Sequence, residues 1–168
     1  MKIRLVSFTV LAAIAFLSYT ALADSRPDAD KAILDRGRYL VWIGGCNDCH
    51  TPGFPEAAGG IPEERWLTGN PVGFQGPWGT NYPKNLRLYM QNISEEQWLA
   101  RVRKPMGPPM PWFNLRDMTD SDLLAIYHFV RSLGPAGVPA PAAVGPGVAV
   151  TTPYIEFFPK NLPKQAGK

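Results

Sequence analysis

The stretch 46–52, CNDCHTP, holds both cysteines of the chain and one of its two histidines. Cys46 and Cys49 are separated by two residues, and His50 follows directly. Two thiols at this spacing lie on one turn of a helix, so both can react with the same edge of one partner. The concentration of these residue types in five consecutive positions predicts a single chemical site around which the rest of the chain folds.

The spacing C-x-x-C-H is typical of an attachment site for haem c. Each thiol adds to a vinyl group on one edge of the porphyrin, and the histidine that follows lies against the face of the ring, where its imidazole binds iron. Cys46, Cys49 and His50 are therefore predicted to bind one covalent haem and its iron.

A redox disulfide and a zinc site are the alternatives for this motif. A Cys46–Cys49 disulfide of the thioredoxin type needs a βαβ context, and the sequence shows no such strands. A zinc site needs a fourth ligand, and the other histidine, His128, lies far along the chain. Haem is the interpretation that the rest of the sequence supports best.

Residues 1–23 are typical of a secretory signal peptide. Lys2 and Arg4 precede an apolar run over 5–17, and the segment closes on a small-x-small sequence. The apolar run is short for a membrane anchor and is diluted by serine and threonine, so we expect export with cleavage. Attachment of haem c also takes place outside the bacterial cytoplasm, and together the two features predict a periplasmic protein.

Charge and composition limit the class of protein further. The full chain has 17 basic and 14 acidic residues, and removal of a signal that holds two basic residues leaves 15 against 14. No basic stripe suited to nucleic acid remains. Eighteen prolines and sixteen glycines indicate a loop-rich domain with few helices and little sheet.

Three amphipathic segments predict helices. Residues 28–43 carry an apolar face and end at a glycine pair, 94–104 begin with a capping box, and 119–133 begin at Thr119 and end at a glycine. Gly37 lies inside the first of these helices, which predicts that another element packs closely against it. The stretch 105–113 is rich in proline and is expected to be extended.

Residues 51–92 show no sustained periodicity and are punctuated by glycine and proline. Their aromatic side chains are too many for a polar linker: Phe54, Trp66, Phe74, Trp78 and Tyr82. The segment is therefore predicted to pack on an apolar object that the chain itself does not contain, which is the porphyrin.

A thioether is the expected ligand on the other face of the iron, since it raises the reduction potential as an electron carrier requires. Met110 stands between Pro109 and Pro111, in a stretch that can present a side chain rigidly. The other candidates are Met90, Met106, Met118 and His128. Trp78 and Trp112 either line the haem crevice or pack in the core. The basic residues near this stretch either neutralise haem propionates, contact a partner or are solvated: Arg101, Arg103, Lys104 and Arg116.

The chain resembles the class I cytochromes c, and among them the small periplasmic monohaem proteins and the cytochrome subunits of dehydrogenases. The matching segments are RGRYL (36–40), GPWGTNYPKNL (76–86) and PPMPWFNLRDMTDSDLLAIYHFVRSLG (108–134). The resemblance implies an all-α cytochrome c-like fold over residues 24–134, with three to four helices around one covalently bound haem. It also implies that the methionine of the MPW sequence, Met110, is the distal ligand, and that the first and last helices cross near Gly37 and Phe129.

One sequence feature departs from similar proteins, which often have Pro-Asn-Leu in the middle segment. This chain has Pro83-Lys84-Asn85-Leu86, which leaves open the carbonyl that accepts the N–H of the proximal histidine.

The expected function is periplasmic electron transfer between redox proteins, from a dehydrogenase or quinol-oxidising donor to a downstream acceptor. We expect no nucleic acid and no small-molecule substrate, and membrane contact only through a partner. The alternatives are a cytochrome subunit fixed in a larger oxidoreductase and a five-coordinate haem enzyme such as a peroxidase. The Pro/Gly-rich tail, 135–168, either docks on a partner or folds back on its own domain.

Overall fold

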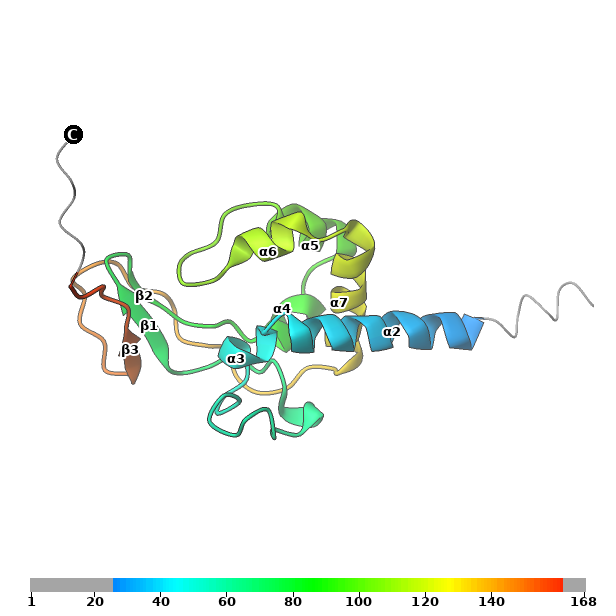
Figure 1. Ribbon diagram of the computed structural model, residues 1–168, viewed down its shortest axis with the longest axis horizontal. Coiled ribbons are helices and arrows are strands. Elements are labelled where there is room, and N and C mark those ends of the chain that lie inside the picture. Colours follow the sequence, from blue (N-terminus) through cyan, green and yellow to red (C-terminus); the bar gives the residue numbers. More distant parts are fainter. Residues whose placement is uncertain (1–25, 162–168) are drawn as a thin grey trace, which may run out of the picture.

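The computed structural model describes residues 26–161, so the predicted signal peptide, 1–23, lies outside the described residues. Within the described part, no helix is both long and apolar enough to cross a membrane. Figure 1 shows helices at one end of the molecule and a small sheet at the other.

The first and last of these helices cross at Gly37. They are α2 (Arg26–Ile43) and α7 (Asp120–Ser132), and they confirm the helices predicted over 28–43 and 119–133. A β-carbon on Gly37 would come within 2.0 Å of the Ala125 carbonyl oxygen and 2.7 Å of Phe129 Cβ. The glycine therefore allows a closer approach of the two helices than any other residue would.

Side-chain caps set the starts of two helices. Ser94 and Gln97 form a complete capping box at α5 (Glu95–Val102), and the Thr119 hydroxyl accepts a hydrogen bond from the Asp122 N–H at the start of α7. Both caps were predicted and are confirmed. Trp98 of α5 donates its indole N–H to the carbonyl oxygen of Leu123 at 2.8 Å, which joins these two helices in the core.

Three short helices and one 3-10 helix complete the helical part: α3 (Cys46–His50), α4 (Leu86–Gln91), α6 (Trp112–Asp117) and the 3-10 helix η1 (Glu63–Arg65). Two of them correct the sequence predictions, since α4 lies in the stretch 51–92, which was expected to be irregular, and α6 begins inside 105–113, which was expected to be extended. Asn85 starts α4 by accepting a hydrogen bond from the Leu88 N–H. Pro111 is the N-cap of α6, a place where proline interrupts no helical hydrogen bond.

The sheet has three short strands in the order β2-β1-β3. β1 (Gly73–Gly76) pairs antiparallel with β2 (Gly79–Asn81) and parallel with β3 (Tyr154–Glu156). The mainly helical fold is confirmed, and the sheet is an addition that the sequence did not specify.

The tail folds back on the domain. Figure 1 shows it running from the end of α7 to β1, where it forms β3. Thr80 and Val144 exchange two backbone hydrogen bonds of 2.9 and 3.0 Å on the way. Of the two placements left open for the tail, the structure has the intramolecular one. The division of the chain into domain and tail at residue 134 stays a prediction.

Candidate haem site

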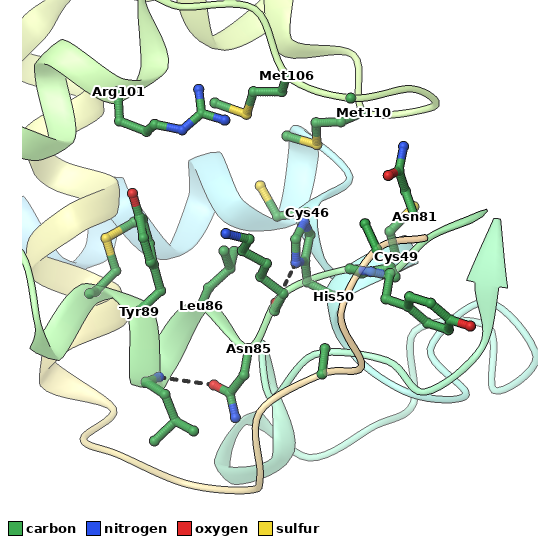
Figure 2. A pocket seen from close by; sticks show the side chains of 18 of the residues that line it. Cys46, Cys49, His50, Asn81, Asn85, Leu86, Tyr89, Arg101, Met106 and Met110 are labelled. Carbon is green, nitrogen blue, oxygen red and sulfur yellow. Dashed lines mark hydrogen bonds between the residues drawn. The ribbon is translucent and has the colours of Figure 1, made fainter. Parts of the chain in front are cut away.

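A cavity of about 730 Å³ lies between α3, α4, the loop that follows α5 and the tail. This is the size of a cofactor site, and its walls are mostly apolar. It brings together the four residues predicted to bind haem: Cys46, Cys49, His50 and Met110. Figure 2 shows Met110 and His50 on opposite sides of the cavity. In this view the Cys46 sulfur lies at a height between the two side chains.

The helix α3 presents both thiols to this cavity. Gly45 precedes it with φ 67°, a left-handed conformation that glycine adopts without strain, and so the chain turns sharply from the end of α2 into the motif. Both cysteines are free and partly exposed. Burial of the sulfur raises the pKa of the Cys46 thiol to about 11, and burial also raises the pKa of the Cys49 thiol.

A backbone carbonyl fixes the ring of His50. Its Nδ1–H donates to the carbonyl oxygen of Lys84 at 2.7 Å, which answers the question left open by the Pro-Lys-Asn-Leu sequence. With the proton on Nδ1, Nε2 carries the lone pair that a metal ligand needs. Burial lowers the pKa of His50, so the imidazole is neutral at pH 7. The carbonyl is the orienting partner that metal-binding histidines usually have.

A buried network of hydrogen bonds joins the C-x-x-C-H motif to residues 67–69. The Thr51 hydroxyl donates to Asn47 Oδ1 at 2.7 Å and accepts from the Leu67 N–H at 2.7 Å. The His50 carbonyl accepts from the Gly69 N–H at 2.8 Å. The two side chains in this network, Asn47 and Thr51, have no solvent exposure. No local pattern in the sequence indicates this role, because it depends on a contact with residues 67–69.

The loop that carries Met110 is tied to the sheet. Asn81 of β2 donates its side-chain amide to the Pro108 carbonyl at 2.5 Å, and a β-carbon on Gly107 would lie 2.9 Å from that amide. The Met110 N–H donates to the Gly107 carbonyl at 3.3 Å, and the Met110 carbonyl accepts from the Trp112 N–H at 2.8 Å. Met110 is therefore held at both ends.

The other residues considered as the second iron ligand differ in whether they line the cavity. Met90 and Met106 line the cavity, whereas His128 is 40% exposed and lies 3.5 Å from Glu95. Met118, Trp78 and Trp112 do not line the cavity. Trp78 donates to the Phe74 carbonyl at 3.3 Å, and Trp112 stacks with the guanidinium of Arg116.

Two features of the site were not predicted. The tail supplies one wall of the cavity through residues 139–143. Asn85, next to the carbonyl that holds His50, donates to the carbonyls of Ala136 and Val138 at 2.7 and 3.2 Å and so fixes the start of the tail. Neither feature has a local signal, because each depends on contacts between residues about 50 positions apart.

The residues present fit a haem c. The cavity offers two thiols on one turn, a neutral imidazole with an oriented ring and a thioether on the opposite side, in apolar surroundings. Cys46 and Cys49 would attach a haem here, and His50 and Met110 would be placed to bind its iron.

Comparison with known proteins identifies the family. The family model for cytochrome c matches residues 34–134, and the chain belongs to the cytochrome c family. It is an electron-transport protein with one C-x-x-C-H haem c site at Cys46 and Cys49. No solved structure matches the chain.

The relatives are subunits of dehydrogenases. The chain is 30% identical over 141 residues to the cytochrome c subunit of the quinone alcohol dehydrogenase of Gluconacetobacter polyoxogenes, covering 76% of this chain and 28% of that protein. It is 29% identical over 128 residues to the gluconate 2-dehydrogenase cytochrome c subunit of Pantoea cypripedii, covering 71% and 27%. The chain thus spans little more than a quarter of the length of these relatives.

Proposed function

We propose that this chain transfers electrons in the periplasm through a haem whose iron is held by His50 and Met110. The observation that supports it most is the opposition of these two side chains across one cavity, each fixed by hydrogen bonds of its own backbone or ring. Haem iron supplies a one-electron couple between its ferrous and ferric states.

The protein's own residues favour transfer over catalysis. If His50 and Met110 both bound the iron, no position would be left open for a substrate, and the mostly apolar walls would limit the access of water to the haem. Among residues 26–161, no cluster of three or more His, Cys, Asp or Glu side chains could hold a further metal ion. With Met110 as a ligand of the iron, a five-coordinate enzyme is the weaker candidate.

We propose a dehydrogenase as the electron donor. The support is that the relatives are named as cytochrome c subunits of quinone alcohol dehydrogenase and of gluconate 2-dehydrogenase. The predicted signal at 1–23 supports the periplasm as the compartment. Purification of the native protein distinguishes a freely diffusing carrier from a fixed subunit. A fixed subunit should copurify with a dehydrogenase, and a free carrier should not.

The ligand assignment is tested with Met110→Ala and a matched control. The ferric wild-type protein should show the weak long-wavelength band of a sulfur–iron bond, and Met110→Ala should lose it. Met106→Ala is the control, because Met106 lies in the same loop and lines the same cavity. It should keep the band. The assignment is overturned if Met110→Ala retains the band or if Met106→Ala loses it. If the wild-type protein lacks the band, the five-coordinate enzyme is favoured.

A further inference from the structure

The walls of the haem cavity carry positive charge and no negative charge. Among the described residues that line it, the side chains with a full charge at pH 7 are Lys84 and Arg101, and none is a carboxylate. A cation beside an apolar cavity interacts strongly with any charge inside, because the local dielectric constant is low.

Arg101 lies near the end of α5, on the methionine side of the cavity. Figure 2 shows its guanidinium beside Met106, on the same side as Met110 and opposite His50. The side chain is partly buried. Its hydrogen bonds are long, to the carbonyls of Lys104 and Pro105 at 3.4 Å each. Within residues 26–161 no carboxylate lies within ion-pair distance of it.

Two neighbouring arginines differ from Arg101, because each forms an ion pair with a carboxylate. Arg103 binds the carboxylate of Asp120 and donates to the Met118 carbonyl at 3.0 Å. Arg116 binds Asp117 through two hydrogen bonds of 2.7 and 2.8 Å. Both are balanced by an acid and neither lines the cavity.

Of the two cations that line the cavity, Lys84 has the weaker electrostatic effect on its interior. Its side chain is exposed, and its ammonium lies 5.6 Å from the centre of the Tyr89 ring. Water and salt screen an exposed charge, whereas a partly buried one is screened much less. The unbalanced charge that acts on the cavity is therefore chiefly that of Arg101.

We propose that Arg101 sets the reduction potential of the haem through its unbalanced positive charge on the methionine side of the cavity. Reduction lowers the charge of the iron by one, so a nearby cation favours the reduced state and raises the potential. The inference rests on the proposed electron transfer but does not require Met110 to be the ligand.

The experiment measures the midpoint potential of the purified haem protein by spectroelectrochemical titration in wild type, Arg101→Gln, Arg101→Lys and Arg103→Gln. We expect Arg101→Gln to lower the equilibrium constant for reduction about tenfold, which is about 59 mV for one electron. Arg101→Lys keeps the charge and should stay near the wild-type potential. Arg103→Gln removes a charge two residues away that is balanced by Asp120, and it should also stay near wild type.

Three results overturn the inference: an unchanged potential in Arg101→Gln, an equal shift in Arg103→Gln, or a shift in Arg101→Lys as large as in Arg101→Gln. The last would show that Arg101 acts through its shape and not its charge. The sulfur–iron band is recorded on the same samples. A wild type without the band contradicts the ligand assignment and leaves this comparison intact. If Arg101→Gln does not accumulate as haem protein, Arg101→Leu removes the same charge with a side chain that suits the apolar wall and cannot bind iron.

Discussion

Gly37 of α2 lies so close to Ala125 of α7 that a β-carbon on the glycine would come within 2.0 Å of the alanine carbonyl oxygen. The two helices on either side of this contact carry much of the core, including Val41 and Val130, both almost without exposure. One of them leads directly into the haem motif. The contact therefore links the packing of the core to the position of the cysteines.

Replacement of Gly37 by alanine should force these helices apart. Because the two nearest obstructing atoms are backbone atoms of Ala125, they cannot move as a flexible side chain would. We expect a loss of about 3 kcal/mol in the free energy of unfolding, at the upper end of the usual cost of overpacking. Denaturant unfolding of the haem protein measures it. Gly145→Ala is the control, since a β-carbon there meets nothing within 4 Å; equal stability of the two variants would contradict the crossing.

The ion pair beside the same crossing should give the stability a pH dependence. Arg36 donates to Asp122 through Nε at 2.8 Å and Nη2 at 3.1 Å. This hydrogen bonding to Arg36 holds the pKa of the Asp122 carboxyl below its ordinary value. A carboxyl with a lowered pKa in the folded state stabilises the fold above its unfolded pKa of about 3.9, and the contribution is lost as the pH falls through the folded value.

Asp122→Asn should therefore be less stable than wild type at neutral pH, and the difference should disappear in acid. Thermal unfolding from pH 7 to pH 2.5 measures this convergence. Asp35→Asn is the control, because the pair of Lys31 and Asp35 is exposed on a single helix and should contribute less. A stability difference for Asp122→Asn that stays constant down to pH 2.5 would exclude the ion pair as its cause.

The sequence predicted those parts of the fold that have a local cause. The helices α2, α5 and α7 were found because each has an apolar face and a recognisable end: a capping box at Ser94, a threonine cap at Thr119 and glycines after α2 and α7. The haem motif was found because its spacing is dictated by covalent chemistry. Met110 was singled out because prolines on both sides prevent a helix there.

The parts that were missed depend on contacts between distant residues. Helix α4 has only six residues, too few for a periodic pattern. It is held by Arg87, which is 5% exposed and donates to the carbonyls of Glu64 and Gly134 at 2.6 Å each. The strand β3 has three exposed side chains and exists because β1 pairs with it. Arginine is usually found on surfaces, so the sequence alone could not indicate a buried role for Arg87.

Asn85 should hold the tail as well as α4. Its side-chain oxygen accepts from the Leu88 N–H at 2.9 Å while its amide binds the tail. Asn85→Ala should lower the free energy of unfolding by about 2 kcal/mol, since it removes an N-cap and a buried hydrogen bond. Asn85→Ser keeps a capping oxygen but lacks the amide. Limited proteolysis should release the tail in both variants, and a tail that resists cleavage in both would show that Asn85 does not hold it.

Two truncations should separate the tail's contribution to the haem cavity from its contribution to the sheet. A chain ending at Gly137 lacks the wall formed by 139–143, whereas a chain ending at Val150 keeps that wall and the Val144 bridge but loses β3. Both keep Cys46 and Cys49, so haem should stay attached. Opening the cavity to water stabilises the ferric state, so the shorter chain should have the lower reduction potential. The missing wall should also let ascorbate reach the haem more closely, so the shorter chain should be reduced faster although the driving force is smaller. The chain ending at Val150 should match the full-length protein in both measurements. Equal potentials in the two truncated proteins would mean that the tail does not seal the site, and that the shielding comes from the loop carrying Met110.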